Sequence, residues 1–174
     1  MVSKISKTLF LLITLTILAS YSQAYNVAPG DVLRLEVYGE PELAMDVTVD
    51  ATGVIEYPFV DKINVAGRIV DDIKNEIVTK LKDGYFINPQ VTVFVKSFKP
   101  FFIQGEVNSP GSYSFELGLT VRKAIALAGG LTERASKKKI YLTKSSDASK
   151  EEVRVSMDQE IESGDVILIK ESFF

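Results

Sequence analysis

Apolar and charged side chains alternate over residues 32–37, where every second position is leucine or valine. Alternation with a period of two predicts a β-strand that buries one face. A Pro-Gly-Asp turn at 29–31 leads directly into this strand. Two further runs of strand-forming residues, 47–49 and 53–58, stand on either side of an Asp-Ala-Thr turn. We expect these two runs to pair as a hairpin, because aspartate and glycine favour tight turns.

The hydrophobic period lengthens over residues 67–82. Isoleucine or leucine recurs at every fourth position from Ile69 to Leu81, and most charged residues lie elsewhere around the helical circumference. This spacing predicts an amphipathic helix that packs on the sheet. Gly84 is expected to end the helix, and the β-branched run at 91–95 predicts another strand.

The pattern restarts after Lys99 and Pro100, where proline denies a strand a backbone donor. Residues 101–107 and 112–115 are predicted to form a hairpin. Its turn carries proline and glycine, at 110 and 111, where a type II turn requires them. We therefore expect a cleaved signal over 1–24, a first domain over 25–98 and a second domain over 99–174.

A second helix is predicted to begin after Thr120, which stands at an N-cap position, and to stop at Gly129 and Gly130. Its expected apolar face consists of Val121, Ala124, Ile125 and Ala128. Strands are expected at 140–143, 153–156 and 166–170. A Gly-Asp-Val turn at 164–166 repeats the one at 30–32, as one local solution used twice. The predicted fold class is α+β, with two small mixed domains that each pack a helix on a sheet.

The N-terminal segment has the layout of a secretory signal. Lys4 and Lys7 precede an uncharged apolar stretch at 8–19. A helix of that length would rise about 18 Å, short of the roughly 30 Å hydrocarbon core, so a permanent anchor is the weaker interpretation. We expect cleavage after Ala24, a mature chain that begins at Tyr25, and no attached lipid because the sequence contains no cysteine.

Composition excludes several classes of protein. Loss of two lysines with the signal changes the net charge from −3 to −5, which disfavours a nucleic-acid partner. The basic run at 137–139 is interpreted as a solvated turn. Without histidine or cysteine, the chain has no Ser-His-Asp triad, disulfide scaffold or thiolate metal site. We expect no cofactor and no metal.

Adjacent acids are the remaining candidates for catalysis. Asp71-Asp72 and Glu151-Glu152 resemble the paired carboxylates of glycoside hydrolysis in residue type alone. Neighbouring side chains on a helix or strand point in different directions, so neither pair faces across a cleft. The sequence therefore predicts no catalytic residue and no enzyme.

Short glycine and proline segments recur in a fixed order along the chain. Those of the first half are Tyr25-Asn26-Val27-Ala28-Pro29-Gly30-Asp31, Gly53-Val54-Ile55 with Pro58, Val65-Ala66-Gly67 and Asn88-Pro89-Gln90-Val91. Those of the second half are Gly105-Glu106-Val107-Asn108, Pro110-Gly111-Ser112-Tyr113, Ala128-Gly129-Gly130-Leu131 and Gly164-Asp165-Val166. Residues 25–96 thereby resemble the N-terminal domain of outer-membrane polysaccharide export proteins of the Wza type. Residues 101–170 resemble the soluble-ligand-binding β-grasp (SLBB) domain that follows it.

These motif residues are interpreted as structural. Positive φ is expected at Gly53, Gly67, Gly111, Gly129 and Gly164, and the prolines should fix turns. The two aspartates should accept hydrogen bonds from their own turns. The complete set of structural motif residues is Pro29, Gly30, Asp31, Gly53, Pro58, Gly67, Pro89, Gly105, Pro110, Gly111, Gly129, Gly130, Gly164 and Asp165.

The resemblance implies a homo-oligomeric ring that conducts capsular or exopolysaccharide and works with an inner-membrane polysaccharide co-polymerase. Two departures qualify it. Ile69 stands where the family often has a threonine N-cap, and the sequence continues only four residues beyond Lys170, too few for the family's C-terminal pore helix. We expect a periplasmic ring, peripheral to the outer membrane of a Gram-negative bacterium. It should dock beneath a separate outer-membrane protein, expected to be a β-barrel.

Two other functions stay open at this point. A free periplasmic module that binds glycans for sensing or retention is the alternative to a conduit, and assembly would distinguish them. A glycan-processing enzyme is disfavoured by the missing histidines and acidic clefts. Three aromatic residues near the boundary, Phe98, Phe101 and Phe102, fit either subunit contacts or ordinary core packing.

Overall fold

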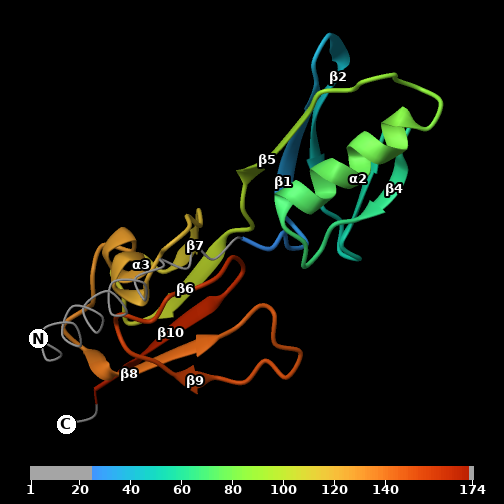
Figure 1. Ribbon diagram of the computed structural model, residues 1–174. Helices are drawn as coiled ribbons and strands as arrows, with labels where there is room; N and C mark the ends of the chain where they lie inside the picture. The colour runs from blue at the N-terminus through green and yellow to red at the C-terminus, as the bar shows by residue number, and fades with distance from the viewer. Residues whose placement is uncertain (1–24, 173–174) are drawn as a thin grey trace, which may run out of the picture.

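Two separate hydrophobic cores organise residues 25–172, which the computed structural model describes (Figure 1). The first core takes its buried residues from Val27 to Val93, and the second from Phe101 to Ile169. This arrangement confirms the expected α+β class with two small mixed domains. The predicted signal, residues 1–24, lies outside the described residues, as do residues 173–174.

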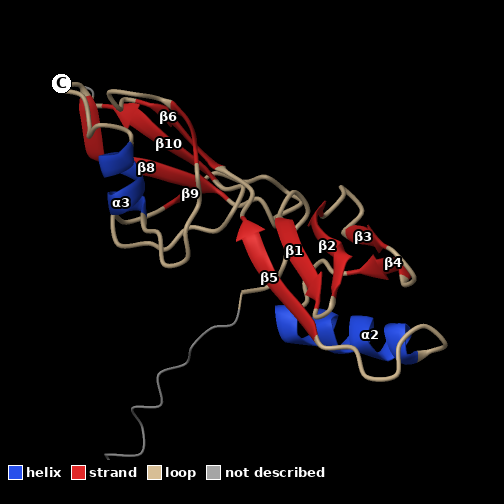
Figure 2. Cartoon of the chain, turned by 90° about the horizontal axis from the view of Figure 1, so that it is seen from above, coloured by secondary structure: helices blue, strands red, loops and turns tan. Residues whose placement is uncertain are grey.

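The first domain packs one helix against a three-stranded antiparallel sheet in the order β2-β1-β5, beside a separate β3-β4 hairpin (Figure 2). Its elements are β1 (Val32–Val37), β2 (Glu40–Thr48), β3 (Val54–Tyr57), β4 (Asp61–Asn64), α2 (Val70–Lys82) and β5 (Val91–Ser97). Leu33 and Leu35 on the central strand are fully buried, as the alternation predicted. The β1 prediction is therefore confirmed in both extent and buried face.

The predicted pairing of 47–49 with 53–58 is wrong. β2 pairs instead with β1, and β3 pairs with β4 in a register that sets Val54 opposite Asn64. The turn between β2 and β3 is nevertheless present. The Asp50 carboxylate accepts the backbone N–H groups of Thr52 and Val54, at 2.8 and 2.9 Å. This turn connects two sheets, and so local turn chemistry did not determine the strand partners.

Helix α2 buries Ile73, Ile77 and Leu81 as the four-residue spacing predicted. The residue at its N-cap is Ile69, and no side chain accepts a hydrogen bond there, in agreement with the expected loss of a threonine cap. The helix ends at Lys82, just before Gly84 with φ +94°. Packing of one apolar face, rather than an N-terminal cap, stabilises this helix.

The second domain has a five-stranded mixed sheet in the order β7-β6-β10-β8-β9. Its elements are β6 (Phe101–Gly105), β7 (Gly111–Tyr113), α3 (Val121–Leu127), β8 (Ala135–Thr143), β9 (Val153–Arg154) and β10 (Val166–Glu171). The first and last strands, β6 and β10, are parallel neighbours at the centre, and every other pair is antiparallel. This order, with a helix between the second and third strands, is the expected β-grasp arrangement.

Helix α3 follows the sequence prediction closely. The hydroxyl of Thr120 accepts the backbone N–H of Lys123 at 3.4 Å, which makes Thr120 the N-cap. The predicted apolar face of the helix is buried. The chain leaves the helix through Gly129 and Gly130, at φ +79° and +90°.

Two local predictions for the second domain are wrong. Gly111 pairs with Ile103 as the first residue of β7 and is not among the residues with positive φ, so the turn is not type II. The basic run at 137–139 lies within β8 rather than in a turn. The hairpin itself is present. The strand continues through the lysines because pairing with β10 extends to Ala135.

Candidate functional site

The end of the first domain that adjoins the second is built around the fully buried carboxylate of Asp31. One carboxylate oxygen accepts the Tyr25 hydroxyl at 2.7 Å and the Ala28 backbone N–H at 2.9 Å. The other accepts the backbone N–H of Lys99 at 2.9 Å. The bond from Ala28 lies within the predicted turn, whereas the bond from Lys99 reaches the segment that joins the domains. Asp31 therefore fixes the connection as well as its own turn.

Tyr25 bridges the two domains. Its hydroxyl lies 3.0 Å from the hydroxyl of Ser163 while it donates to Asp31, and burial raises the pKa of the phenol above its ordinary value. Its ring packs edge-on against Phe98 at 4.8 Å, and Phe98 packs edge-on against Phe115 at 5.5 Å. A polar pair and an aromatic stack thus cross the junction together.

The second Gly-Asp-Val turn faces the first across Lys99. Buried Asp165 accepts the backbone N–H groups of Ser145 at 2.8 Å and Glu162 at 2.9 Å, and burial raises the pKa of its carboxyl. A Cβ on Gly164 would lie 2.7 Å from the Ser145 hydroxyl and 2.9 Å from the Lys99 side chain. Since φ at Gly164 is +80°, only glycine suits this position.

The predicted motif residues divide between this junction and isolated turns. Positive φ is confirmed at Gly53, Gly67, Gly129 and Gly164, and it is wrong at Gly111. Gly30, Gly105 and Gly130 also have positive φ. A Cβ on Gly105 would overlap the carbonyl oxygen of Ile169, because β6 and β10 approach closely there. The remaining motif residues are Pro29, half-buried beside Gly30; Pro58, exposed after β3; Pro89, buried before β5; and Pro110, exposed before β7.

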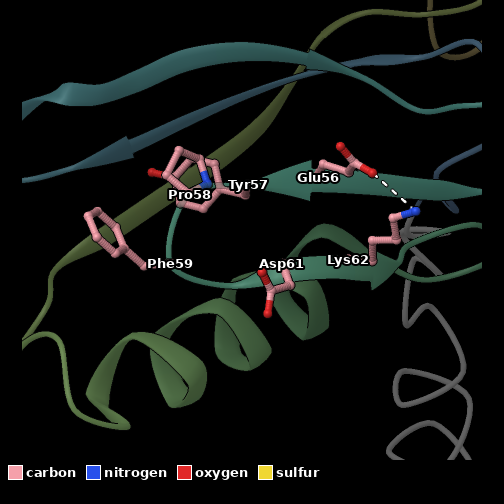
Figure 3. A pocket seen from close by; sticks show the side chains of 6 residues that line it. All are labelled: Glu56, Tyr57, Pro58, Phe59, Asp61 and Lys62. Carbon is pink, nitrogen blue, oxygen red and sulfur yellow. Dashed lines mark ion pairs between the residues drawn. The ribbon is translucent and has the colours of Figure 1, made fainter.

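The opposite end of the first domain carries an open pocket of about 680 Å³ (Figure 3). Its lining residues are Glu56, Tyr57, Pro58, Phe59, Asp61 and Lys62, from the β3-β4 hairpin. Glu56 and Lys62 form an ion pair at 3.2 Å. The buried Tyr57 hydroxyl donates to the Leu43 carbonyl at 2.7 Å, and burial raises its pKa to about 12.

Aromatic rings from a second segment adjoin this pocket. Phe59 lies 5.0 Å from Tyr85 and 6.2 Å from Phe86, measured between ring centroids. Phe59 and Tyr85 are about half exposed, at 51% and 56%. The hairpin and the segment after α2 thus combine at the end of the domain far from the junction (Figure 1).

The comparisons with known proteins cover both domains. Residues 19–96 match the family described as polysaccharide biosynthesis/export protein, and residues 100–155 match the SLBB domain. Together, the two matches support a polysaccharide export protein. The two matches follow each other in the order that the sequence motifs indicated.

Three curated relatives agree with these matches. Exopolysaccharide production protein ExoF of Rhizobium meliloti (strain 1021) is 34% identical over 88 residues, which are 49% of this chain and 21% of the relative. EPS I polysaccharide export outer membrane protein EpsA of Ralstonia solanacearum is 29% identical, over 62% of this chain and 35% of the relative. EpsA of Ralstonia nicotianae (strain ATCC BAA-1114 / GMI1000) is 25% identical, over 83% and 45%. The chain therefore spans less than half the length of each relative.

One acid of each adjacent acidic pair forms an ion pair with a lysine. Asp71 of the first acidic pair forms an exposed ion pair with Lys74 at 2.9 Å, and Glu152 of the second pairs with Lys170 at 2.9 Å. Among residues 25–172, no group of three or more acidic residues is arranged to hold a metal ion. Within the same residues, no helix has the length and apolarity needed to cross a bilayer.

Sequence reasoning missed the aromatic pocket. The available signal was the run Tyr85-Phe86-Ile87, which places three large apolar residues outside any periodic segment. Such residues in a loop are more informative about function than buried ones. The three boundary phenylalanines have different positions: Phe101 is fully buried, Phe98 packs in the junction, and Phe102 is 38% exposed.

Proposed function

We propose that this export protein is a periplasmic component of a conduit that carries capsular or exopolysaccharide toward the outer membrane. The observation that carries the proposal is the pair of family matches, in order, over both domains. The absence of histidine from the sequence agrees with a transport role rather than a chemical one.

The conduit is proposed to be a homo-oligomeric ring. Small α/β domains enclose a polar channel only by assembling around an axis. The junction supports this role, because the buried bonds of Asp31 and Tyr25 hold the two domains in one orientation, as a ring subunit requires. The proposed partners are the polysaccharide, further copies of the chain, an inner-membrane co-polymerase and a separate outer-membrane protein.

Deletion of the gene tests the proposal. We expect surface polysaccharide to disappear while polymer or its lipid-linked precursor accumulates inside, and a plasmid copy of the gene should restore export. Normal surface polymer would overturn the conduit and favour the alternative, a free periplasmic module that binds glycans. Light scattering of the purified protein gives the second arm, since a ring is multimeric and a sensor module need not be.

A further inference from the structure

The pocket at the far end of the first domain has a size and lining that suit a small polar ligand with a flat apolar face. Its volume of about 680 Å³ falls within the range of roughly 300–1,000 Å³ for small-ligand sites. Three of its six lining residues are charged, and the exposed Pro58 and Phe59 supply apolar ring surface. Figure 3 shows these groups around one hairpin turn.

This turn differs from an ordinary hairpin end in the residue type that adopts positive φ, because glycine, asparagine or aspartate usually does so. Phe59 has φ +64°, in the left-handed region that bulky residues avoid, whereas Asp61, at φ +59°, is of a type that tolerates it. A residue held there costs about 1–3 kcal/mol relative to glycine or an extended conformation. Phe59 is half exposed, so core burial does not offset that cost. Strain retained at an exposed aromatic residue points to a role for the side chain itself.

The ring of Phe59 is held in place by its neighbours. Tyr85 lies beside it at an interplanar angle of 48°, and Phe86 meets it nearly perpendicularly, at 81°. Aromatic pairs in such arrangements contribute about 0.5–1.5 kcal/mol each. The ring is therefore positioned before any ligand arrives, which lowers the entropy cost of binding.

Two polar groups, one in the pocket and one on the adjoining Tyr85, have no polar partner among the described residues. Within the described residues, neither the Asp61 carboxylate nor the Tyr85 hydroxyl makes a hydrogen bond or ion pair. Glu56 and Lys62 are about three-quarters exposed, at 73% and 75%, and can exchange their ion pair for ligand contacts. A pocket that combines an exposed aromatic ring with acceptors and donors matches a pyranose ring, which has an apolar C–H face and hydroxyl groups around its edge.

We propose that this pocket binds one sugar unit of the transported polymer, with Phe59 stacked on the sugar and Asp61 accepting its hydroxyls. The inference rests on the proposed function, which supplies a glycan as the ligand. A protein partner fits the pocket less well, because the centres of protein interfaces are depleted of charged residues. A single weak subsite also suits transport, since a polymer must be released as readily as it is held.

Nuclear magnetic resonance titration of the purified protein tests this assignment. The probe is the strain's own exopolysaccharide, partially hydrolysed to oligosaccharides of five to ten sugars. We expect shifts confined to residues 56–62 and 85–86. Phe59→Leu keeps an apolar side chain but removes the flat ring, and it should weaken binding about tenfold. Phe59→Tyr keeps the ring and should bind within about twofold of the wild type.

Phe94→Leu is the matched control, because Phe94 is also an exposed ring, 46% accessible, but on strand β5 and outside the pocket. Unchanged binding by Phe59→Leu, or equal loss in Phe94→Leu, would overturn the subsite. So would an export defect in Phe59→Leu cells with normal oligosaccharide binding, which would mean that the pocket contacts a protein. If gene deletion leaves export intact while Phe59→Leu still weakens binding, the conduit fails and the sugar site remains.

Discussion

The chain adopts positive φ at both ends of the first domain, but with different residue types. At the junction, φ is positive at Gly30, where the chain turns into β1. At the far end, Phe59 adopts positive φ without the freedom of glycine. The junction therefore has the residue that minimises strain, and the far end retains side chains despite strain. Glycine therefore indicates a position where the fold requires the backbone conformation and no side chain.

The carboxylates at the two ends of the first domain also differ, in burial and in hydrogen bonding. The junction carboxylate of Asp31 has three donors and is fully buried. The carboxylate of Asp61 at the far end is exposed and makes no bond within the described residues. Satisfied buried groups fix a structure, whereas unused exposed groups are available to a ligand.

The largest effect is expected for Gly164→Val at the junction. The new side chain would meet Ser145 and Lys99, and a β-branched residue is strained at φ +80°. We expect the second domain to lose about 3 kcal/mol of unfolding free energy. Thermal unfolding followed by circular dichroism measures it. Gly111→Val is the control, because Gly111 has no positive φ and no atom within 4 Å of its Cβ position, and it should change stability by less than about 0.5 kcal/mol.

Asp31→Ala should have the next largest effect. It leaves the Tyr25 hydroxyl and the Ala28 and Lys99 N–H groups without their acceptor, at a cost of about 2 kcal/mol after water replaces part of the loss. Urea denaturation gives the free energy. Asp71→Ala, which removes an exposed ion pair and one of two acids in the first turn of α2, should cost less than about 1 kcal/mol. Equal losses would mean that the three hydrogen bonds of Asp31 add little to stability.

Phe59→Asn should stabilise the far end, in contrast to both junction variants. Asparagine tolerates positive φ, and relief of strain should outweigh the exposed ring contacts by about 0.5–1 kcal/mol. Tyr85→Asn is the control: it removes the same ring pair at a residue without positive φ, and should lower stability by about 0.5 kcal/mol. A loss in Phe59→Asn would show that Phe59 is retained for packing.

Elements with a strong period could be predicted from sequence, and elements held by partners could not. Strand β1 and the buried face of α2 follow from alternation and from four-residue spacing. The first half of β2 begins Glu40-Pro41-Glu42 and has no such pattern, yet it continues a strand whose second half, residues 45–48, pairs with β1. β4 was missed for a similar reason, since Ile63 is its one buried residue. Tertiary pairing decides such segments.

The same distinction applies to the two candidate regions. Glycine and aspartate revealed both Gly-Asp-Val turns, because each turn is a local requirement of the backbone. Their position on either side of Lys99 depends on the packing of two domains and has no local signature. The far pocket combines the β3-β4 hairpin with residues after α2, so its rings meet only in the folded chain.

The smallest effect concerns pH and Asp165. Burial raises the pKa of this carboxyl above its ordinary 3.8, so the folded state binds the proton more tightly than the unfolded state. Stability from this group is therefore complete below the ordinary pKa and is lost as pH rises through the raised value. Relative to Asp165→Asn, which cannot titrate, the wild type should become less stable as pH rises above the ordinary pKa of 3.8. Urea denaturation at several pH values measures this difference.

Asp147→Asn is the control, for which we expect the opposite dependence of stability on pH. Hydrogen bonds from Ser149 lower the pKa of Asp147, so the stability advantage of the wild type over this variant should be lost as pH falls. A flat difference for Asp165→Asn would mean that the N–H donors of Ser145 and Glu162 cancel the effect of burial.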